Sequence, residues 1–146
     1  MELLPEDRER LIRYLDFLEA ELSDFPKFSK IDWKTYTEDR DMRRNLERWI
    51  ENIVNCSIDI AKVILAAEDK RIPVTYKEIL KEFGATHSDE VFGENISQWA
   101  ILRNILAHEY LDIRWSSIKK FIQVAEPTYR KLVDKVKALL LFQKEA

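Results

Sequence analysis

The sequence is poor in cysteine, glycine and proline, with one Cys, two Gly and four Pro among 146 residues. A lone cysteine, Cys56, cannot form a disulfide within the chain, which excludes a disulfide-stapled scaffold and suits a reducing compartment. So few turn formers favour long helices with short connections. No apolar run approaches the roughly 18 residues of a membrane span, and the acidic N-terminal segment is unlike a secretory signal. We therefore expect a cytoplasmic protein.

The sequence also lacks a basic excess, since its formal net charge is −3. This balance argues against an extended surface that binds nucleic acid independently of the nucleotide sequence. The charge is unevenly distributed, however, because residues 103–137 hold eight basic and four acidic side chains. Two interpretations stay open for this segment. It forms either a solvated helix face or a local basic rim able to hold a short stretch of RNA.

Apolar residues recur at alternating steps of four and three, the spacing of one helix face. The pattern predicts a helix over residues 6–23, a long central helix after Thr37, a short helix opened by Thr75, a helix from near Ser88 or Asp89 through the 103–110 segment, and a last helix from about residue 118 to the end. No strand pattern of comparable length exists. The sequence thus predicts one domain over residues 1–146, an all-α antiparallel four-helix bundle with an additional short helix.

Several local features complete this prediction. Residues 24–36 are interpreted as a connection, Thr37 as an N-cap, Gly84 as a C-terminal cap and Pro127 as a bend or a break. Cys56 is predicted to be a small core residue and Asp59 a partnered, half-buried structural carboxylate. His87 has no ligand-spaced partner in the sequence and is predicted to be an exposed loop residue.

One segment concentrates residue types that do chemistry: Arg103, Asn104, His108 and Tyr110 fall within eight residues. At about 100° per residue, Arg103 and His108 lie about 140° apart on an unbroken helix, whereas Asn104 and His108 share a face. Arg103 and Tyr110 also align if the helix continues that far. Two arrangements could unite Arg103 and His108. Either the helix ends or distorts near His108, or the site is assembled across two chains of a symmetric dimer.

The Arg-x4-His-x-Tyr pattern formed by Arg103, His108 and Tyr110 resembles the signature of the HEPN superfamily of helical ribonucleases. The wider chain, over roughly residues 5–143, resembles the HepT branch of prokaryotic toxins. Residues 47–61 are similar to the long central helix of that branch, and residues 74–78 to its short connecting helix. The signature is the specific part of this likeness, since the flanking similarities are soft helical patterns.

The resemblance implies a metal-independent endoribonuclease of a type VII-like toxin–antitoxin pair that needs no cofactor. Such proteins act as homodimers in which Arg and His of both chains line a shared cleft. Carried over to this sequence, Arg103 and His108 are the catalytic residues and Asn104 is a supporting polar residue. The implied partners are an RNA substrate and an MntA-like nucleotidyltransferase antitoxin, which adds AMP to Tyr110. No metal site is implied.

The chemistry of the residues agrees with this implication. An unperturbed histidine titrates near pH ~6.5 and serves as acid or base at neutral pH, while an arginine binds two phosphate oxygens and neutralises transition-state charge. Arg114, Lys119 and Lys120 are candidate RNA contacts or solvated charges. Two other functions remain open: a non-catalytic helical module that binds a nucleotidyltransferase, and a four-helix adaptor that only dimerises.

Overall fold

The protein is described here from a computed structural model that covers residues 2–145, with side chains described as far as residue 142. Helices account for every regular element in this part of the chain, and it contains no strand. They are α1 (Pro5–Leu22), α2 (Phe25–Phe28), α3 (Trp33–Glu38), α4 (Arg40–Ala67), α5 (Tyr76–His87), α6 (Glu90–Ser97), the 3-10 helix η1 (Gln98–Ile101), α7 (Leu102–His108) and α8 (Leu111–Glu145). The predicted all-α class is confirmed.

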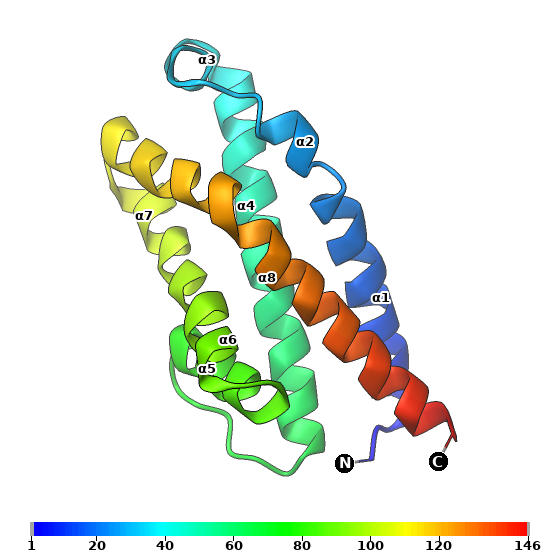
Figure 1. Cartoon of the computed structure of the whole chain (residues 1–146). Helices are drawn as coiled ribbons and strands as arrows, with labels where there is room; N and C mark the ends of the chain where they lie inside the picture. The colour runs from blue at the N-terminus through cyan, green and yellow to red at the C-terminus, as the bar shows by residue number, and fades with distance from the viewer. Residues whose placement is uncertain (1, 146) are drawn as a thin grey trace.

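The bundle has four helical parts, which are α1, α4, the α6–η1–α7 segment and α8 (Figure 1). The two chain ends lie at one end of this bundle, and the α7–α8 turn lies at the other, near α3. α5 is the predicted short helix, and it packs against α6 and α4. The bundle therefore presents the predicted motif at the end opposite the chain termini.

The core is continuous and rich in aromatic rings. Trp49 of α4 lies 4.7 Å from the Phe25 ring and 5.8 Å from the Phe121 ring of α8. Its indole nitrogen donates to the Glu21 carbonyl at 2.7 Å, so its polar atom is satisfied inside the core. Cys56 is 5% exposed, as predicted for a small core residue, and burial raises the pKa of its thiol to about 12. A thiol that stays protonated is a poor nucleophile.

Helix starts agree with the prediction at two positions and differ at one. The Thr75 hydroxyl accepts from the Glu78 amide at 3.2 Å, and the Asp89 carboxylate accepts from the Phe92 amide at 2.8 Å. The N-cap of α4 is Asp39, whose carboxylate accepts from the Met42 amide at 3.0 Å. The prediction of Thr37 was wrong because Thr37 lies inside α3, a helix that begins at Trp33 within the predicted connection over residues 24–36.

Gly84 does not end α5, contrary to the prediction, because this helix continues to His87. The glycine serves the packing of two helices instead. A Cβ atom placed on Gly84 would come within 2.5 Å of the Gly93 Cα atom, and one on Gly93 within 2.8 Å of the Lys81 carbonyl oxygen. Only hydrogen atoms on both sides allow α5 and α6 to approach this closely.

Pro127 lies within α8, which continues through it as one ribbon (Figure 1). Of the predicted bend or break, the break does not occur. His87 was also misplaced. It is the last residue of α5, and its Nε2 lies 2.8 Å from a carboxylate oxygen of Glu68 at the end of α4. Its ring also packs 4.9 Å from that of Phe83. His87 is therefore a structural link between α4 and α5.

Candidate functional site

The predicted motif surrounds the end of α7. This helix ends at His108, whose side chain is exposed, and Glu109 then adopts an extended backbone conformation before α8 begins at Leu111. Tyr110 lies in this turn and is 82% exposed. The helix thus ends at His108, which is the starting condition of one of the two arrangements that the sequence left open. The imidazole and the phenol therefore both lie at the surface of one turn.

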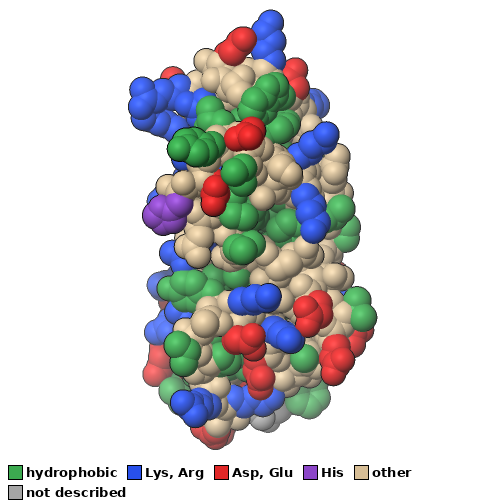
Figure 2. Space-filling model, turned by 90° about the vertical axis from the view of Figure 1, so that its left-hand side faces the viewer, with side chains coloured by type: hydrophobic (Ala, Val, Ile, Leu, Met, Phe, Trp, Pro, Cys, Tyr) green, Lys and Arg blue, Asp and Glu red, His purple; other side chains and the backbone are tan. Residues whose placement is uncertain are grey.

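Figure 2 shows the face formed by α5, α6 and α7, where a histidine side chain lies at the edge of the molecule with Lys and Arg side chains above and below it. Acidic and basic side chains alternate over the lower half of this face. Among the described residues His108 is the exposed histidine, whereas His87 is largely buried.

Arg103 is the second residue of α7, and its side chain lies beside residues of α4 and α5. Its guanidinium carbon lies 4.8 Å from the centre of the Tyr76 ring, within the range of a cation–π contact. Arg103 and Tyr76 line two neighbouring pockets. One has a volume of about 230 Å³ and reaches Asn55, Asp59 and Lys62 of α4. Arg103 is thus half-buried, oriented by an aromatic ring, and open to solvent-filled space.

Asn104 lines the other pocket, which has a volume of about 420 Å³ and includes Val74 and Ile101. Neither of these two pockets includes His108. Within one chain, therefore, the end of α7 does not bring His108 into the pockets that Arg103 lines. This result agrees with the 140° separation expected on an unbroken helix.

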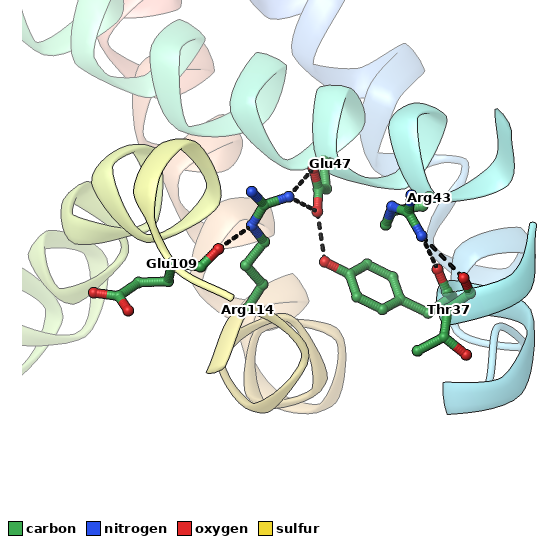
Figure 3. A network of polar contacts seen from close by, with 6 residues as sticks. Thr37, Arg43, Glu47, Glu109 and Arg114 are labelled. Carbon is green, nitrogen blue, oxygen red and sulfur yellow. Dashed lines mark hydrogen bonds and ion pairs between the residues drawn. The ribbon is translucent and has the colours of Figure 1, made fainter. Parts of the chain in front are cut away.

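A polar network fixes the turn that carries the motif (Figure 3). The Arg114 Nε donates to the Glu109 carbonyl at 2.7 Å, and one of its terminal nitrogens lies 3.3 Å from the Glu47 carboxylate. Glu47 also accepts from the hydroxyl of Tyr36, whose pKa is raised well above its usual value by burial and by this carboxylate. The Tyr36 hydroxyl therefore remains a donor, and α3, α4 and α8 together hold the turn.

The sequence predicts Arg114 as an RNA contact or a solvated charge, whereas the structure places its guanidinium half-buried inside this network. Lys119 and Lys120 are exposed on different sides of α8. Lys119 lines a pocket with Trp33 and Trp115, and the Lys120 nitrogen lies 5.9 Å from the Trp99 ring. The two lysines therefore do not form one continuous patch with Arg114.

One residue of this region differs from the sequence prediction, and another was not predicted to take part. Asp59 is exposed and lines the pocket beside Arg103, so the prediction of a half-buried, partnered carboxylate was wrong. It lies on α4 one turn before Lys62, on the polar side of a helix whose other faces are apolar. The sequence analysis does not single out Tyr76, although the Thr75 cap places it at the first position of α5.

Replacing Glu47 with alanine is expected to lower the free energy of unfolding by about 2 kcal/mol, because Arg114 and Tyr36 lose their shared acceptor. Urea denaturation measures this change. The matched control is Glu51→Ala, one turn further along α4, which removes a surface pair 3.9 Å from the mostly exposed Arg48. We expect the control to change stability by less than about 1 kcal/mol. Equal effects for both variants would contradict a structural role for the network.

No helix within residues 2–145 combines the length and apolar character needed to cross a membrane. No match to the chain was found among curated proteins. A solved structure of a tri-AMPylated Shewanella oneidensis HEPN toxin in complex with an MNT antitoxin is similar to this chain, with a TM-score of 0.74 and 17% sequence identity over 88% of this chain and 96% of that one. At this identity the likeness establishes the fold.

The family model described as ribonuclease HepT-like matches residues 18–136, which include both the central helix α4 and the whole motif around the end of α7. The resemblance stated from the Arg-x4-His-x-Tyr pattern is therefore confirmed. This chain belongs to the HepT-like ribonuclease family.

Proposed function

We propose that this protein is a metal-independent endoribonuclease toxin in which Arg103 and His108 are the catalytic residues. The observation that carries the proposal is the position of these two side chains in a HepT-like chain. Both residues belong to α7. His108 is exposed at the end of this helix, and Arg103 lines two neighbouring pockets. An imidazole and a guanidinium supply a proton carrier and an anion binder, which is sufficient for RNA cleavage.

RNA carries its own nucleophile in this reaction. His108 accepts the proton of a ribose 2′-hydroxyl, whose oxygen attacks the adjacent phosphorus. Arg103 binds the non-bridging phosphate oxygens and neutralises the added charge of the pentacoordinate transition state. The bond from phosphorus to the 5′-oxygen then breaks, and that oxygen leaves with a proton from a protonated histidine. The products are a 2′,3′-cyclic phosphate and a 5′-hydroxyl.

The catalytic unit is a homodimer with one shared cleft. Within a single chain the pockets lined by Arg103 do not include His108, and an isologous dimer supplies both groups from two copies. Asn104, which lines the larger pocket beside Arg103, supports the bound RNA. Lys119 and Lys120 are exposed on α8 and add positive charge along the path of longer RNA.

Mixing two inactive variants tests this shared cleft. Arg103→Ala and His108→Ala protomers, unfolded together and refolded at equal amounts, are expected to regain roughly a quarter of the wild-type cleavage rate. About half of the dimers are then mixed, and each mixed dimer holds one complete Arg–His set. Each variant refolded alone is the control. No recovery in a mixture shown by native mass spectrometry to contain mixed dimers would contradict a site built from two chains.

The proposed regulator is an MntA-like nucleotidyltransferase antitoxin that transfers AMP from ATP to the Tyr110 hydroxyl, which loses its proton as pyrophosphate leaves. The similar HEPN toxin is tri-AMPylated and in complex with an MNT antitoxin, and Tyr110 is the most exposed tyrosine of the described residues. Each added AMP brings a negative phosphodiester and a bulky nucleoside two residues from His108. Both repel or block an incoming RNA phosphate.

The direct test is cleavage of transfer RNA and of single-stranded RNA by the purified protein in excess EDTA. We expect fragments that end in 2′,3′-cyclic phosphate, detected by mass spectrometry. Single-stranded DNA of the same sequence is the matched control, because it lacks the 2′-hydroxyl and should stay intact. Loss of RNA cleavage in EDTA with recovery on adding a divalent metal would overturn the metal-independent mechanism.

The alternative function is a non-catalytic helical module that binds a nucleotidyltransferase. One observation favours it: Arg103 contacts Tyr76 on one side of α7, while His108 lies exposed at the end of the helix. This module would form a tight complex with the nucleotidyltransferase, and the protein alone would leave RNA uncut. Cleavage that depends on His108 distinguishes the two functions.

A further inference from the structure

A polar groove runs beside Arg103, between α4, α5 and α7. We call it the Tyr76 groove, and it is lined by Asn55, Ile58, Asp59, Lys62, Tyr76 and Arg103. Its volume of about 230 Å³ is smaller than the ~300 to 1,000 Å³ of typical small-molecule sites. It is therefore suited to a backbone group of a polymer rather than to a whole nucleotide.

Two cations converge on one aromatic ring in this groove. The Lys62 nitrogen lies 5.0 Å from the centre of the Tyr76 ring, and the Arg103 guanidinium carbon lies 4.8 Å from it. Neither cation forms an ion pair within the described part of the chain. Asp59 is the single acidic side chain lining the groove, so the groove carries a net positive charge. Two like charges held this close attract an anion.

The aromatic ring also determines where Arg103 points. A free arginine side chain loses rotamer freedom when it is immobilised, and a cation–π contact offsets part of that cost before the substrate arrives. Tyr76 is itself held at the first position of α5 by the Thr75 cap. The direction of the guanidinium therefore depends on the start of α5 as well as on α7.

The larger pocket continues from this groove, because both are lined by Tyr76 and Arg103. Its walls include Val74 and Ile101, whose side chains are 91% and 59% exposed, and its rim carries Asn104. Apolar walls with an amide at the rim suit a ribose and a base. The charged groove and the apolar pocket together match the alternation of phosphate and nucleoside in RNA.

From this arrangement we infer that the Tyr76 groove is an RNA subsite in which one phosphodiester binds between Lys62 and Arg103, with Tyr76 as the positioning residue for Arg103. The inference rests on the proposed ribonuclease function, and it adds Lys62 and Tyr76 to the residues that engage RNA. The nucleoside that follows this phosphodiester occupies the pocket lined by Val74 and Ile101.

Binding of a fluorescein-labelled single-stranded RNA, measured by anisotropy, tests the subsite without relying on cleavage. The parent protein is the His108→Ala variant, so that the RNA stays intact. Adding Lys62→Gln is expected to weaken binding by about tenfold and to reduce the slope of log affinity against log salt by about 0.7, the value for one lost phosphate contact on a single strand.

The matched control is Lys131→Gln, because the Lys131 nitrogen also lies over an aromatic ring, 4.9 Å from that of Phe92, but on α8 beside α6. We expect this control to leave both affinity and salt slope within error of the parent. Equal weakening by the two substitutions would overturn the subsite, since the effect would then be one of net charge. Unchanged binding on Lys62→Gln would also overturn it.

The role of Tyr76 has a readout that does not involve RNA. Ring currents shift the NMR signals of protons over an aromatic face, so the Arg103 Nε–H resonance is expected to move in Tyr76→Leu and to stay near its wild-type position in Tyr76→Phe. In cleavage assays Tyr76→Leu should lower kcat, and Tyr76→Phe should restore it. An unmoved resonance in Tyr76→Leu would overturn the positioning role.

These measurements separate the subsite from the proposed function. Wild-type protein that binds RNA through Lys62 without cleaving it would leave the subsite intact and remove the ribonuclease. Cleavage that depends on Arg103 and His108, together with Lys62→Gln binding equal to that of the parent, would preserve the ribonuclease and remove the subsite.

Discussion

Replacing His108 with alanine is expected to lower the rate of RNA cleavage by about 10² to 10⁴-fold, the usual contribution of a general acid or base. His108 is exposed at the end of α7, so the substitution removes the proposed proton carrier without opening a cavity in the core. The measurement is the initial rate of fragment formation from one labelled RNA, with circular dichroism to verify that the helices remain.

The second histidine of the chain gives a matched control. His87 pairs with Glu68 and packs against Phe83 at the end of α5, and it lines neither of the two pockets beside Arg103. His87→Gln keeps a side chain able to hydrogen-bond with Glu68, so we expect it to cleave RNA at the wild-type rate. Full activity of His108→Ala, or equal loss in the two variants, would contradict the assignment of His108.

The helical pattern was predictable because it follows from spacing alone. The apolar stripe of α4 and the caps at Thr75 and Asp89 are local features, and each lies where its sequence indicated. The errors have tertiary causes. The N-cap of α4 is Asp39 and not Thr37, because residues 33–38 form a separate helix that packs against α4 and α8.

Gly84 illustrates a second kind of limit. A glycine near the end of an apolar pattern indicates a C-terminal cap, yet here it permits close approach to Gly93, nine residues further along the chain. The surface that packs against the glycine determines whether it caps a helix or allows close helix packing. A single sequence does not reveal that surface. The same limit explains His87, whose partner Glu68 belongs to another helix.

The sequence indicates which residue types make up the candidate site, but it says less about how their side chains are arranged in space. Helical periodicity predicts a separation of about 140° between Arg103 and His108, and neither of the two pockets lined by Arg103 includes His108. Tyr76, Lys62 and Asp59 surround Arg103 from two other helices. Spacing within one helix carries no information about such neighbours.

The second large expected effect is the loss of RNA cleavage when Tyr110 is modified. When the protein is co-expressed with an MntA-like nucleotidyltransferase, intact-mass spectrometry is expected to show added mass in multiples of AMP, and cleavage should fall to background. The Tyr110→Phe variant lacks the acceptor oxygen, so both the added mass and the loss of cleavage should disappear. The phenol is 82% exposed, so the substitution has little effect on packing.

Tyr76→Phe is the matched control for the modification, because Tyr76 is the other exposed tyrosine of the described residues, at 42%. Its co-expressed form should carry the same added mass as the wild type. Mass addition that persists in Tyr110→Phe, or that vanishes in Tyr76→Phe, would place the acceptor elsewhere. Modification confined to Tyr110 without loss of cleavage would contradict the charge and steric block, since a negative nucleotide two residues from His108 should exclude an RNA phosphate from the cleft.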